Sequence, residues 1–440
     1  MDEATTIFAL STAPGRAGVA VVRVSGPRAG DLIDAIAAPR PKKRLAALRS
    51  IRNPETGEAI DQGLVLWFGA PRSETGEDMA ELHLHGSPAV VKAVLDVLGR
   101  QAGCRLAEPG EFAQRAFGNG KIDLAEAEGL ADLIEAETEA QRRQALRQMG
   151  GALSRLYEGW RAELMRASAL VETAIDFSDE ADVANNVFAT ARNLVGTLDD
   201  AIGAHLADEH RGEIVRDGFR VVLAGAPNVG KSSLLNALAR RDAAIVSEEA
   251  GTTRDVIEVR LDLDGLAVIV SDTAGIRDAE GAVEQEGIRR TLAHAGEADL
   301  VIWLSDALAS HQPPPPGLGR SILWVVNKVD LGTPSGLPDG ALAISAKTGA
   351  GLDALTGDIS KRARERVGTG SAPAITRERY RHQLNACMSA LNDFMSGPAS
   401  DIELRAEDLR RATHALGRIT GRVDVEDVLG EIFARFCIGK

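Results

Sequence analysis

The chain has 440 residues, of which 44% are apolar and 26% charged, which is typical of a soluble protein with about two to four domains and sizeable cores. It holds 64 Asp and Glu against 50 Lys and Arg, so it is not coated for non-specific nucleic-acid binding, although a local basic surface is allowed. The cysteines, Cys104, Cys387 and Cys437, form neither a disulfide framework nor a metal-ligand spacing. With no secretory signal and no long apolar run, we expect a cytoplasmic protein with no membrane-spanning helix.

The first 120 residues alternate short apolar runs with glycine-rich turns. Runs of β-like composition cover residues 18–25, 63–68 and 79–84, and residues 89–98 have the apolar spacing of a helix. This pattern predicts a small α+β domain over residues 1–120.

Residues 121–217 lack strand-like runs. Apolar side chains recur there at helical spacing, at Leu153, Leu156, Trp160, Leu164, Ala167 and Val171. The same periodicity returns in residues 368–440, where Asp424 is placed to cap a helix that carries Val425, Val428, Leu429, Ile432, Phe433 and Phe436. Neither piece looks self-sufficient, so we infer one α-helical domain that is split by an insertion.

The insertion covers residues 218–367. Apolar runs of strand length at 220–224, 267–271, 299–304 and 322–326 alternate with helical segments, which favours a buried parallel sheet. The crossover at 306–320 contains a run of prolines at 313–316, so we expect its helix to be short or missing. The predicted fold class is multidomain, with an α+β N-terminal domain, an α-helical middle domain and an inserted α/β domain of the P-loop kind.

Residues 225–232 (GAPNVGKS) fit the P-loop pattern, directly after a strand and before the helical run 233–239. Glycines let backbone N–H groups surround phosphate oxygens, and the helix N-terminus adds a favourable dipole. Lys231 should reach the outer phosphates, and Ser232 should bind Mg²⁺. Such a motif can match by accident, so its context decides. The nucleotide-binding residues predicted here are Gly225, Asn228, Val229, Gly230, Lys231, Ser232 and Ser233.

Later motifs supply that context in the expected order. Asp272, in 272–275 (DTAG), would hold the water shell of the metal, and Gly275 could sense the γ-phosphate. Asp330, in 327–330 (NKVD), can accept two hydrogen bonds from guanine that adenine cannot offer in that arrangement. Residues 345–347 (SAK) would contact the guanine oxygen through the backbone. The order of these motifs along the chain predicts that the bound nucleotide is GTP. The further residues predicted to bind it are Asn327, Lys328, Asp330, Ser345, Ala346 and Lys347.

The run 251–255 (GTTRD) resembles the switch of the Era and MnmE group of GTPases, with Thr252 beside the nucleotide and Thr253 as a second magnesium ligand. Ile276 stands where many small GTPases carry a glutamine that orients water. Runs similar to the MnmE (TrmE) family of tRNA modification GTPases extend over essentially the whole chain, at 14–26, 75–78, 109–112, 115–128 and 429–440, the last ending in CIGK.

The resemblance implies that residues 1–120 are a folate-binding-like domain that also mediates homodimerisation. Position by position, the residues that match the folate contacts of the family are Arg23, Glu81, Lys121 and Lys440. A carboxylate can pair with the N–H donors of the pterin, and cations suit the anionic groups of the folate. Without the family, each of these charges would be interpreted as a surface residue. The chain departs from the family pattern near this site, at Glu74, His83, Leu84 and Ser87.

The resemblance also implies that K⁺ beside the P-loop supplies the charge that other GTPases take from an arginine finger, while two G domains associate face to face. Asn228 matches the potassium-ligating asparagine, and Ser247, Glu249 and Thr252 match positions that bind K⁺ largely through backbone carbonyls. Taken without the family, Asn228 is a residue favoured in turns.

Glu284 matches the general base of the family, acting through a bridging water, although Glu280 and Glu286 are nearby alternatives. Cys437 could attack a uridine ring as a thiolate, or it could pack as a small hydrophobe beside Phe436, and the sequence leaves both open. His83 and His85 alternate on a strand without a metal-ligand set, which favours packing or surface roles.

The function implied is a potassium-dependent GTP hydrolase that forms a heterotetramer with an FAD-dependent, MnmG-like partner. Together they would add a one-carbon unit from a tetrahydrofolate derivative (5-formyl or methylene type), plus an amine, to the wobble uridine of certain tRNAs. The basic runs 361–366 and 377–381 are interpreted as solvated helix faces. The alternatives are an Era-like switch for ribosome assembly without RNA chemistry, and a folate-dependent transferase that its G domain merely regulates.

Overall fold

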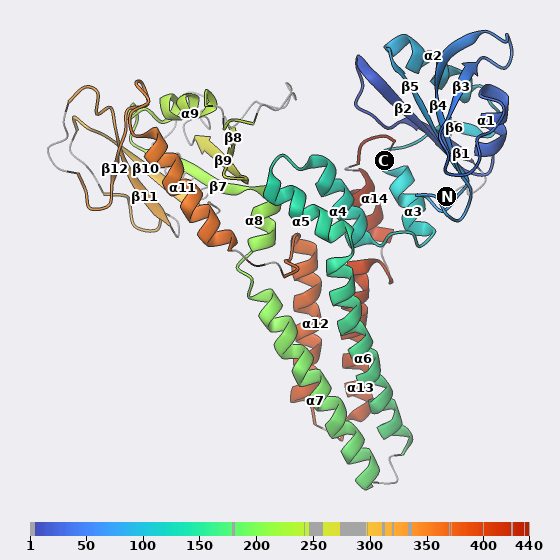
Figure 1. Cartoon of the computed structure of the whole chain (residues 1–440). Helices are drawn as coiled ribbons and strands as arrows, with labels where there is room; N and C mark the ends of the chain where they lie inside the picture. Colours follow the sequence, from blue (N-terminus) through green and yellow to red (C-terminus); the bar gives the residue numbers. More distant parts are fainter. Residues whose placement is uncertain are drawn as a thin grey trace, which may run out of the picture. The chain divides into compact units, whose positions relative to one another are not determined.

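Figure 1 shows the computed structural model, which describes residues 5–439 apart from 178–180, 242, 246–257, 273–295, 297, 310–312, 319–320, 333–336, 369, 371, 399, 424–425 and 435. The side chains of residues 181, 183–184 and 426–428 are also outside the description. The chain divides into two compact units, Met1–Ala131 with Tyr157–Arg161 and Leu416–Lys440, and Asp132–Leu156 with Ala162–Ala415.

The first unit contains a sheet in the order β3-β4-β5-β2-β1-β6. Its strands are antiparallel neighbours except β1 and β6, which are parallel. Their bounds are β1 (Thr6–Leu10), β2 (Ala17–Ser25), β3 (Ala47–Arg52), β4 (Ala59–Phe68), β5 (Met79–Gly86) and β6 (Cys104–Leu106). The strands expected at 18–25, 63–68 and 79–84 are confirmed.

The two faces of this sheet differ because side chains alternate along a strand. Val22 and Leu82 point into a core that they share with α1 (Ala29–Ile36) and α2 (Pro88–Gly99), the latter confirming the helix expected at 89–98. Arg23 lies opposite Glu81 in the β2–β5 register, one residue along from these core positions. The alternation therefore places a charged pair on the face away from the two helices.

The same unit holds α3 (Glu111–Gly118), the start of α4 (Leu124–Glu135) and α14 (Glu426–Ala434). Ile432, Phe433 and Phe436 pack with Ala113 and Leu124 in one apolar cluster. Beyond α14 the tail reaches the sheet. Ile438 forms a β-bridge with Pro109, and the Ser11 hydroxyl donates to the Gly439 carbonyl at 2.9 Å.

The second unit contains a helical bundle drawn from both sides of the insertion. Its helices are α5 (Glu139–Met149), α6 (Ala152–Asp176), α7 (Ala181–Leu206), α8 (Arg211–Asp217), α12 (Glu378–Ser396) and α13 (Ile402–Thr420), of which α6 and α13 continue into the first unit. Phe188 of α7 and Phe394 of α12 pack with ring centroids 5.6 Å apart and planes tilted by 46°, and the Arg192 guanidinium donates to the Met395 carbonyl. These contacts pack helices from before and after the insertion against each other.

The inserted α/β part has a sheet in the order β12-β11-β10-β7-β9-β8, parallel apart from the antiparallel β8–β9 pair. Its elements are β7 (Phe219–Gly225), α9 (Lys231–Ala239), β8 (Glu258–Leu263), β9 (Leu266–Asp272), β10 (Leu300–Asp306), β11 (Ile322–Asn327), β12 (Leu342–Ala343) and α11 (Leu352–Val367). The expected strands are confirmed. Between β10 and β11 the described residues contain no helix, as the prolines predict.

Parallel strands end at the same edge of a sheet, and here the strand ends carry the polar residues. Gly225, Asp272, Asp306 and Asn327 are the last residues of β7, β9, β10 and β11. Ligands of open α/β sheets bind at this edge. The fold therefore gathers the motifs of the inserted domain in one place. In the described part of the chain, no helix is long and apolar enough to cross a membrane.

Candidate functional site

The P-loop joins the end of β7 to the start of α9. Gly225, Asn228 and Gly230 have positive φ angles of 145°, 64° and 98°. A Cβ atom on Gly225 would collide with the Leu304 carbonyl oxygen, and one on Gly230 with the side chain of Asn327. Glycine is therefore required at both positions. The loop ends at the α9 N-terminus, where free N–H groups and the helix dipole favour an anion.

Lys231 is the first residue of α9 and is buried. Its ammonium group donates to the carbonyl oxygens of Gly225 at 2.9 Å and Ala226 at 3.0 Å. These acceptors are neutral, and hydrogen bonds to charged acceptors are roughly twice as strong. A phosphate oxygen in the loop can therefore replace them.

Ser232 and Asp272 meet at the centre of the site. The Ser232 hydroxyl donates to Asp272 Oδ2 at 2.7 Å, and Asp272 is 2% exposed at the end of β9. A hydroxyl and a carboxylate oxygen this close are hard ligands of the kind that Mg²⁺ prefers, either directly or through its waters. The two residues fit the predicted magnesium site.

Asn327 connects three loops at the edge of the sheet. Its amide nitrogen donates to the Val229 carbonyl at 2.9 Å, and its side-chain oxygen accepts the Ala346 N–H at 3.0 Å. The side chain is 2% exposed. One buried amide thus fixes the P-loop and the 345–347 segment relative to each other.

The residues predicted to read the base lie in the same region. The Ser345 hydroxyl donates to Asp330 Oδ1 at 2.6 Å, which orients the carboxylate. Lys328 (φ 67°) donates its ammonium group to the Asn228 carbonyl at 2.8 Å and to Asp306 Oδ2 at 2.7 Å. The hydrogen bond from Lys328 is the main reason why the pKa of Asp306 lies below its ordinary value. Sequence reasoning missed Asp306, although its place at a strand end was a usable signal.

Some of the remaining residues predicted for the G domain lie within the described part of the chain, and others lie outside it. Val229 is buried, while Ser233 and Lys347 are exposed. The predicted residues that lie outside the described part of the chain are Ser247, Glu249, Thr252, Thr253, Gly275 and Glu284. For these the sequence remains the source of the prediction.

The charged pair on the N-terminal sheet has additional partners. Arg23 Nε donates to Glu81 Oε1 at 3.1 Å, and Arg23 Nη1 lies 3.0 Å from Glu74 Oε2. The other Glu81 oxygen lies 3.2 Å from His83 Nε2. Glu74, where the chain departs from the family pattern, therefore occupies one side of the Arg23 guanidinium. His85 pairs with Asp61 at 2.8 Å, so each histidine is beside a carboxylate.

Lys121 lies next to the β4–β5 loop, where its ammonium group donates to the Pro71 carbonyl at 3.0 Å. Lys440 lies outside the described residues. In the part that the structure describes, no group of three or more His, Cys, Asp or Glu side chains is placed to hold a metal ion.

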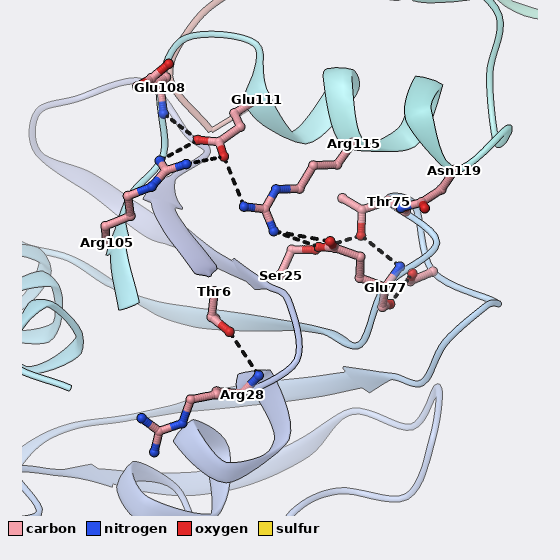
Figure 2. A network of polar contacts seen from close by, with 11 residues as sticks. Thr6, Ser25, Arg28, Thr75, Glu77, Arg105, Glu108, Glu111, Arg115 and Asn119 are labelled. Carbon is pink, nitrogen blue, oxygen red and sulfur yellow. Dashed lines mark hydrogen bonds and ion pairs between the residues drawn. The ribbon is translucent and has the colours of Figure 1, made fainter. Parts of the chain in front are cut away.

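Figure 2 shows a network of ion pairs that holds the β4–β5 loop against α3. Arg115 Nη1 lies 3.1 Å from Glu77 Oε2, and Arg115 Nη2 lies 3.0 Å from Glu111 Oε1. Arg105 donates to both Glu111 oxygens, at 2.7 and 2.8 Å. Ser25 continues the network from β2, donating to Glu77 Oε2 at 2.7 Å. The network thereby fixes the loop that carries Glu74.

The three cysteines lie in different environments. Burial raises the pKa of the Cys387 thiol to about 12, which makes it a poor nucleophile, and burial also raises the pKa of Cys104. Cys437 is exposed. It lies outside the apolar cluster of its neighbour Phe436, so it does not pack there as a small hydrophobe.

A P-loop, a Ser–Asp pair and a guanine-reading segment at the edge of a parallel sheet define a P-loop GTPase, an enzyme that hydrolyses GTP. The profile of the MnmE helical domain matches residues 124–437, and that of the GTP-binding protein TrmE N-terminus matches residues 6–121. The chain belongs to the MnmE family of tRNA modification GTPases.

Two relatives by sequence agree with this assignment. The tRNA modification GTPase MnmE of Parvibaculum lavamentivorans is 53% identical over 445 residues, which cover 99% of this chain and 100% of that protein. Its counterpart in Rhodopseudomonas palustris is 51% identical over 440 residues, with 99% of each covered. A solved structure of Era from Aquifex aeolicus is 20% identical and covers 50% of this chain and 99% of that one, with a TM-score of 0.26.

The network of Figure 2 predicts a stability change in Glu111→Gln. Glu111 is 6% exposed, and burial by itself would raise its pKa. Hydrogen bonds from Arg105, the Glu108 N–H and Arg115 outweigh burial, so the pKa lies below its ordinary value. The ionised form thus stabilises the fold above the unfolded pKa, and this contribution is lost as pH falls through the folded pKa. Breaking the pair should cost about 3 kcal/mol at pH 7.

Native-state hydrogen exchange of α3 measures this free energy locally, which suits a multidomain chain. The matched control is Glu108→Gln, since that side chain is exposed and contributes its backbone N–H to the network. The difference between wild type and Glu111→Gln should shrink as the pH is lowered below about 4. If the amides of α3 exchange equally slowly in Glu111→Gln and Glu108→Gln at pH 7, the network does not stabilise the fold.

Proposed function

We propose that this chain is a potassium-dependent GTP hydrolase that acts as a homodimer with an FAD-dependent, MnmG-like partner. Together they would modify the wobble uridine of certain tRNAs with a one-carbon unit from a tetrahydrofolate derivative and an amine. The observation that carries the GTPase part is the Ser232–Asp272 hydrogen bond of 2.7 Å beside the buried Lys231. The proposed domains are 1–120 for folate and dimerisation, 121–217 and 368–440 for the helical part, and 218–367 for GTP.

The residues of the P-loop would bind and orient GTP before hydrolysis. Lys231 would move from the Gly225 and Ala226 carbonyls to the outer phosphates. Ser232, with Thr253, would ligate Mg²⁺, and Asp272 would hold its water shell; the ion supplies charge for the phosphates when bound. Asp330, oriented by Ser345, would read the guanine edge.

Potassium would bind next to the P-loop at Asn228, with Ser247, Glu249 and Thr252 as further ligands. Asn228 is exposed three residues before α9 begins, which is compatible with this role. Its carbonyl oxygen accepts from Lys328, which leaves the side-chain oxygen as the atom offered to the ion. The ion supplies positive charge to the phosphates, as an arginine finger does elsewhere.

The potassium proposal predicts much faster GTP hydrolysis in KCl than in NaCl at equal ionic strength. Asn228→Ala should erase the difference. Since alanine is strained at this φ, Asn228→Gly is the matched variant that removes the side chain without strain, and it should behave in the same way. A native protein with equal rates in the two salts would contradict the proposal, as would a glycine variant that keeps the potassium preference.

Glu284 is proposed as the base that orients the attacking water through a second water, because Ile276 cannot do so. A positioned general base typically contributes 10²–10⁴-fold, so Glu284→Ala should lower single-turnover hydrolysis in KCl by about that factor. Nucleotide affinity, measured with a fluorescent analogue, should change little. Glu280→Ala and Glu286→Ala are the controls and should be far milder. Near-native turnover in Glu284→Ala would transfer the role to one of its neighbours.

Folate would bind on the charged face of the N-terminal sheet, at Arg23, Glu81, Lys121 and Lys440. Glu81→Ala removes a charged hydrogen-bond partner and should weaken binding of a reduced folate about ten- to a hundredfold in calorimetry. Glu74→Ala is the matched variant, because Glu74 also pairs with Arg23; its loss frees the guanidinium and should leave affinity equal or higher. GTP hydrolysis should be unaffected in both. Absence of binding by the native protein would refute the site.

A further inference from the structure

The N-terminal domain carries a run of positive charge that the proposed function does not use. Residues 38–52 contain Arg40, Lys42, Lys43, Arg44, Arg49 and Arg52, and no Asp or Glu. The chain as a whole has 64 acidic side chains against 50 Lys and Arg. Such a stretch can form a local basic surface even in a protein whose net charge is negative, because net charge does not show how the charges are distributed.

The fold adds further cations to the same end of the sheet. The loop between α1 and β3 lies beside the end of β4, where the Arg44 N–H donates to the Trp67 carbonyl at 2.8 Å. The Arg44 guanidinium donates to the Arg72 carbonyl in the β4–β5 loop. Lys121 reaches the same loop at Pro71. We call the resulting set the cationic surface; its members are Lys42, Lys43, Arg44, Arg49, Arg72 and Lys121.

These six charges are not neutralised within the described residues. None of the six lies within 4.0 Å of a carboxylate oxygen there, and the hydrogen bonds that Arg44, Arg49 and Lys121 donate all go to backbone carbonyls. The neighbouring carboxylates have other partners: Asp34 pairs with Arg40, Glu74 with Arg23, and Asp78 accepts the Ala70 N–H.

The two basic runs on helices are different. In the run 361–366, Arg362 pairs with Asp358 and Arg364 with Asp264. In the run 377–381, Arg377 pairs with Asp132, and Arg381 pairs with Asp208 and Glu213. Their positive charge is neutralised by nearby carboxylates, unlike that of the cationic surface.

We propose that the cationic surface binds the phosphate backbone of the tRNA. Exposed Lys and Arg side chains without counter-charges gain affinity for a polyanion by releasing its condensed counterions, and they need no base sequence to do so. Arg44 is held over the Phe68 ring at 5.7 Å, which orients its guanidinium with little loss of freedom on binding. Lys121 belongs to both this surface and the proposed folate site. The inference rests on the tRNA-modifying role proposed above.

The test is a triple variant, Lys42→Gln with Lys43→Gln and Arg72→Gln, in the full-length protein. All three side chains are exposed, and none was assigned to GTP or folate. Binding of an unmodified tRNA transcript is measured by fluorescence anisotropy over a series of KCl concentrations. Loss of three phosphate contacts should flatten the slope of log affinity against log salt by about 2 to 3, and lower affinity at least tenfold near 0.1 M salt. GTP hydrolysis should be unchanged.

The matched control removes three exposed cations outside the surface and outside the run 38–52, with Lys92→Gln, Arg147→Gln and Arg155→Gln. This control changes the net charge by the same amount but leaves the cationic surface intact. It should therefore keep the wild-type dependence of affinity on salt. Wild-type protein that does not bind tRNA, or a test variant with an unaltered slope, would overturn the proposal. Unaltered tRNA binding with lost wobble modification would assign the surface to a protein partner instead. If the triple variant has a flattened salt slope but the wild-type protein modifies no uridine, the cationic surface binds tRNA and the proposed function is wrong.

Discussion

The buried side chain of Asn327 is the contact on which the nucleotide site depends. Its nitrogen donates to the Val229 carbonyl and its oxygen accepts the Ala346 N–H, so it fixes the P-loop and the 345–347 segment, predicted to read the base, relative to each other. Gly230 has to be glycine because any Cβ would collide with this amide. The parallel sheet makes the contact possible, since β7 and β11 both end at the same edge. Lys231, Ser232 and Asp330 are positioned by loops that start from these strand ends.

A different constraint builds the N-terminal site. Side-chain alternation in β2 and β5 puts Val22 and Leu82 in the core and leaves Arg23 opposite Glu81 on the other face. The ion-pair network of Figure 2 then holds the β4–β5 loop, and with it Glu74, next to Arg23. The same loop contributes Arg72 to the cationic surface. One loop therefore links the candidate folate residues to the surface proposed for RNA.

The sequence predicted β2, β4 and β5 of the first sheet and β7, β9, β10 and β11 of the second, because their apolar runs are alternating or continuous. The strands β1, β3, β6, β8 and β12 were not predicted. Other features depend on tertiary contacts. In α6 the helix is confirmed, yet Tyr157 is buried while Leu156 and Trp160 are half-buried, because packing against neighbouring helices selects the face. The Glu74–Arg23 and Lys328–Asp306 pairs join residues far apart in sequence, so spacing could not reveal them. The cationic surface likewise needs loops that the fold brings together.

We propose that GTP hydrolysis at the Lys231 site drives uridine modification in tRNA. The most direct measurement is mass spectrometry of tRNA nucleosides from a bacterial strain that lacks its own copy of this family and expresses this chain. We expect the wild-type chain to restore the modified wobble uridine, and Lys231→Ala, expressed at the same level, to restore none. Full restoration by Lys231→Ala, or none by the wild-type chain, would contradict the proposal.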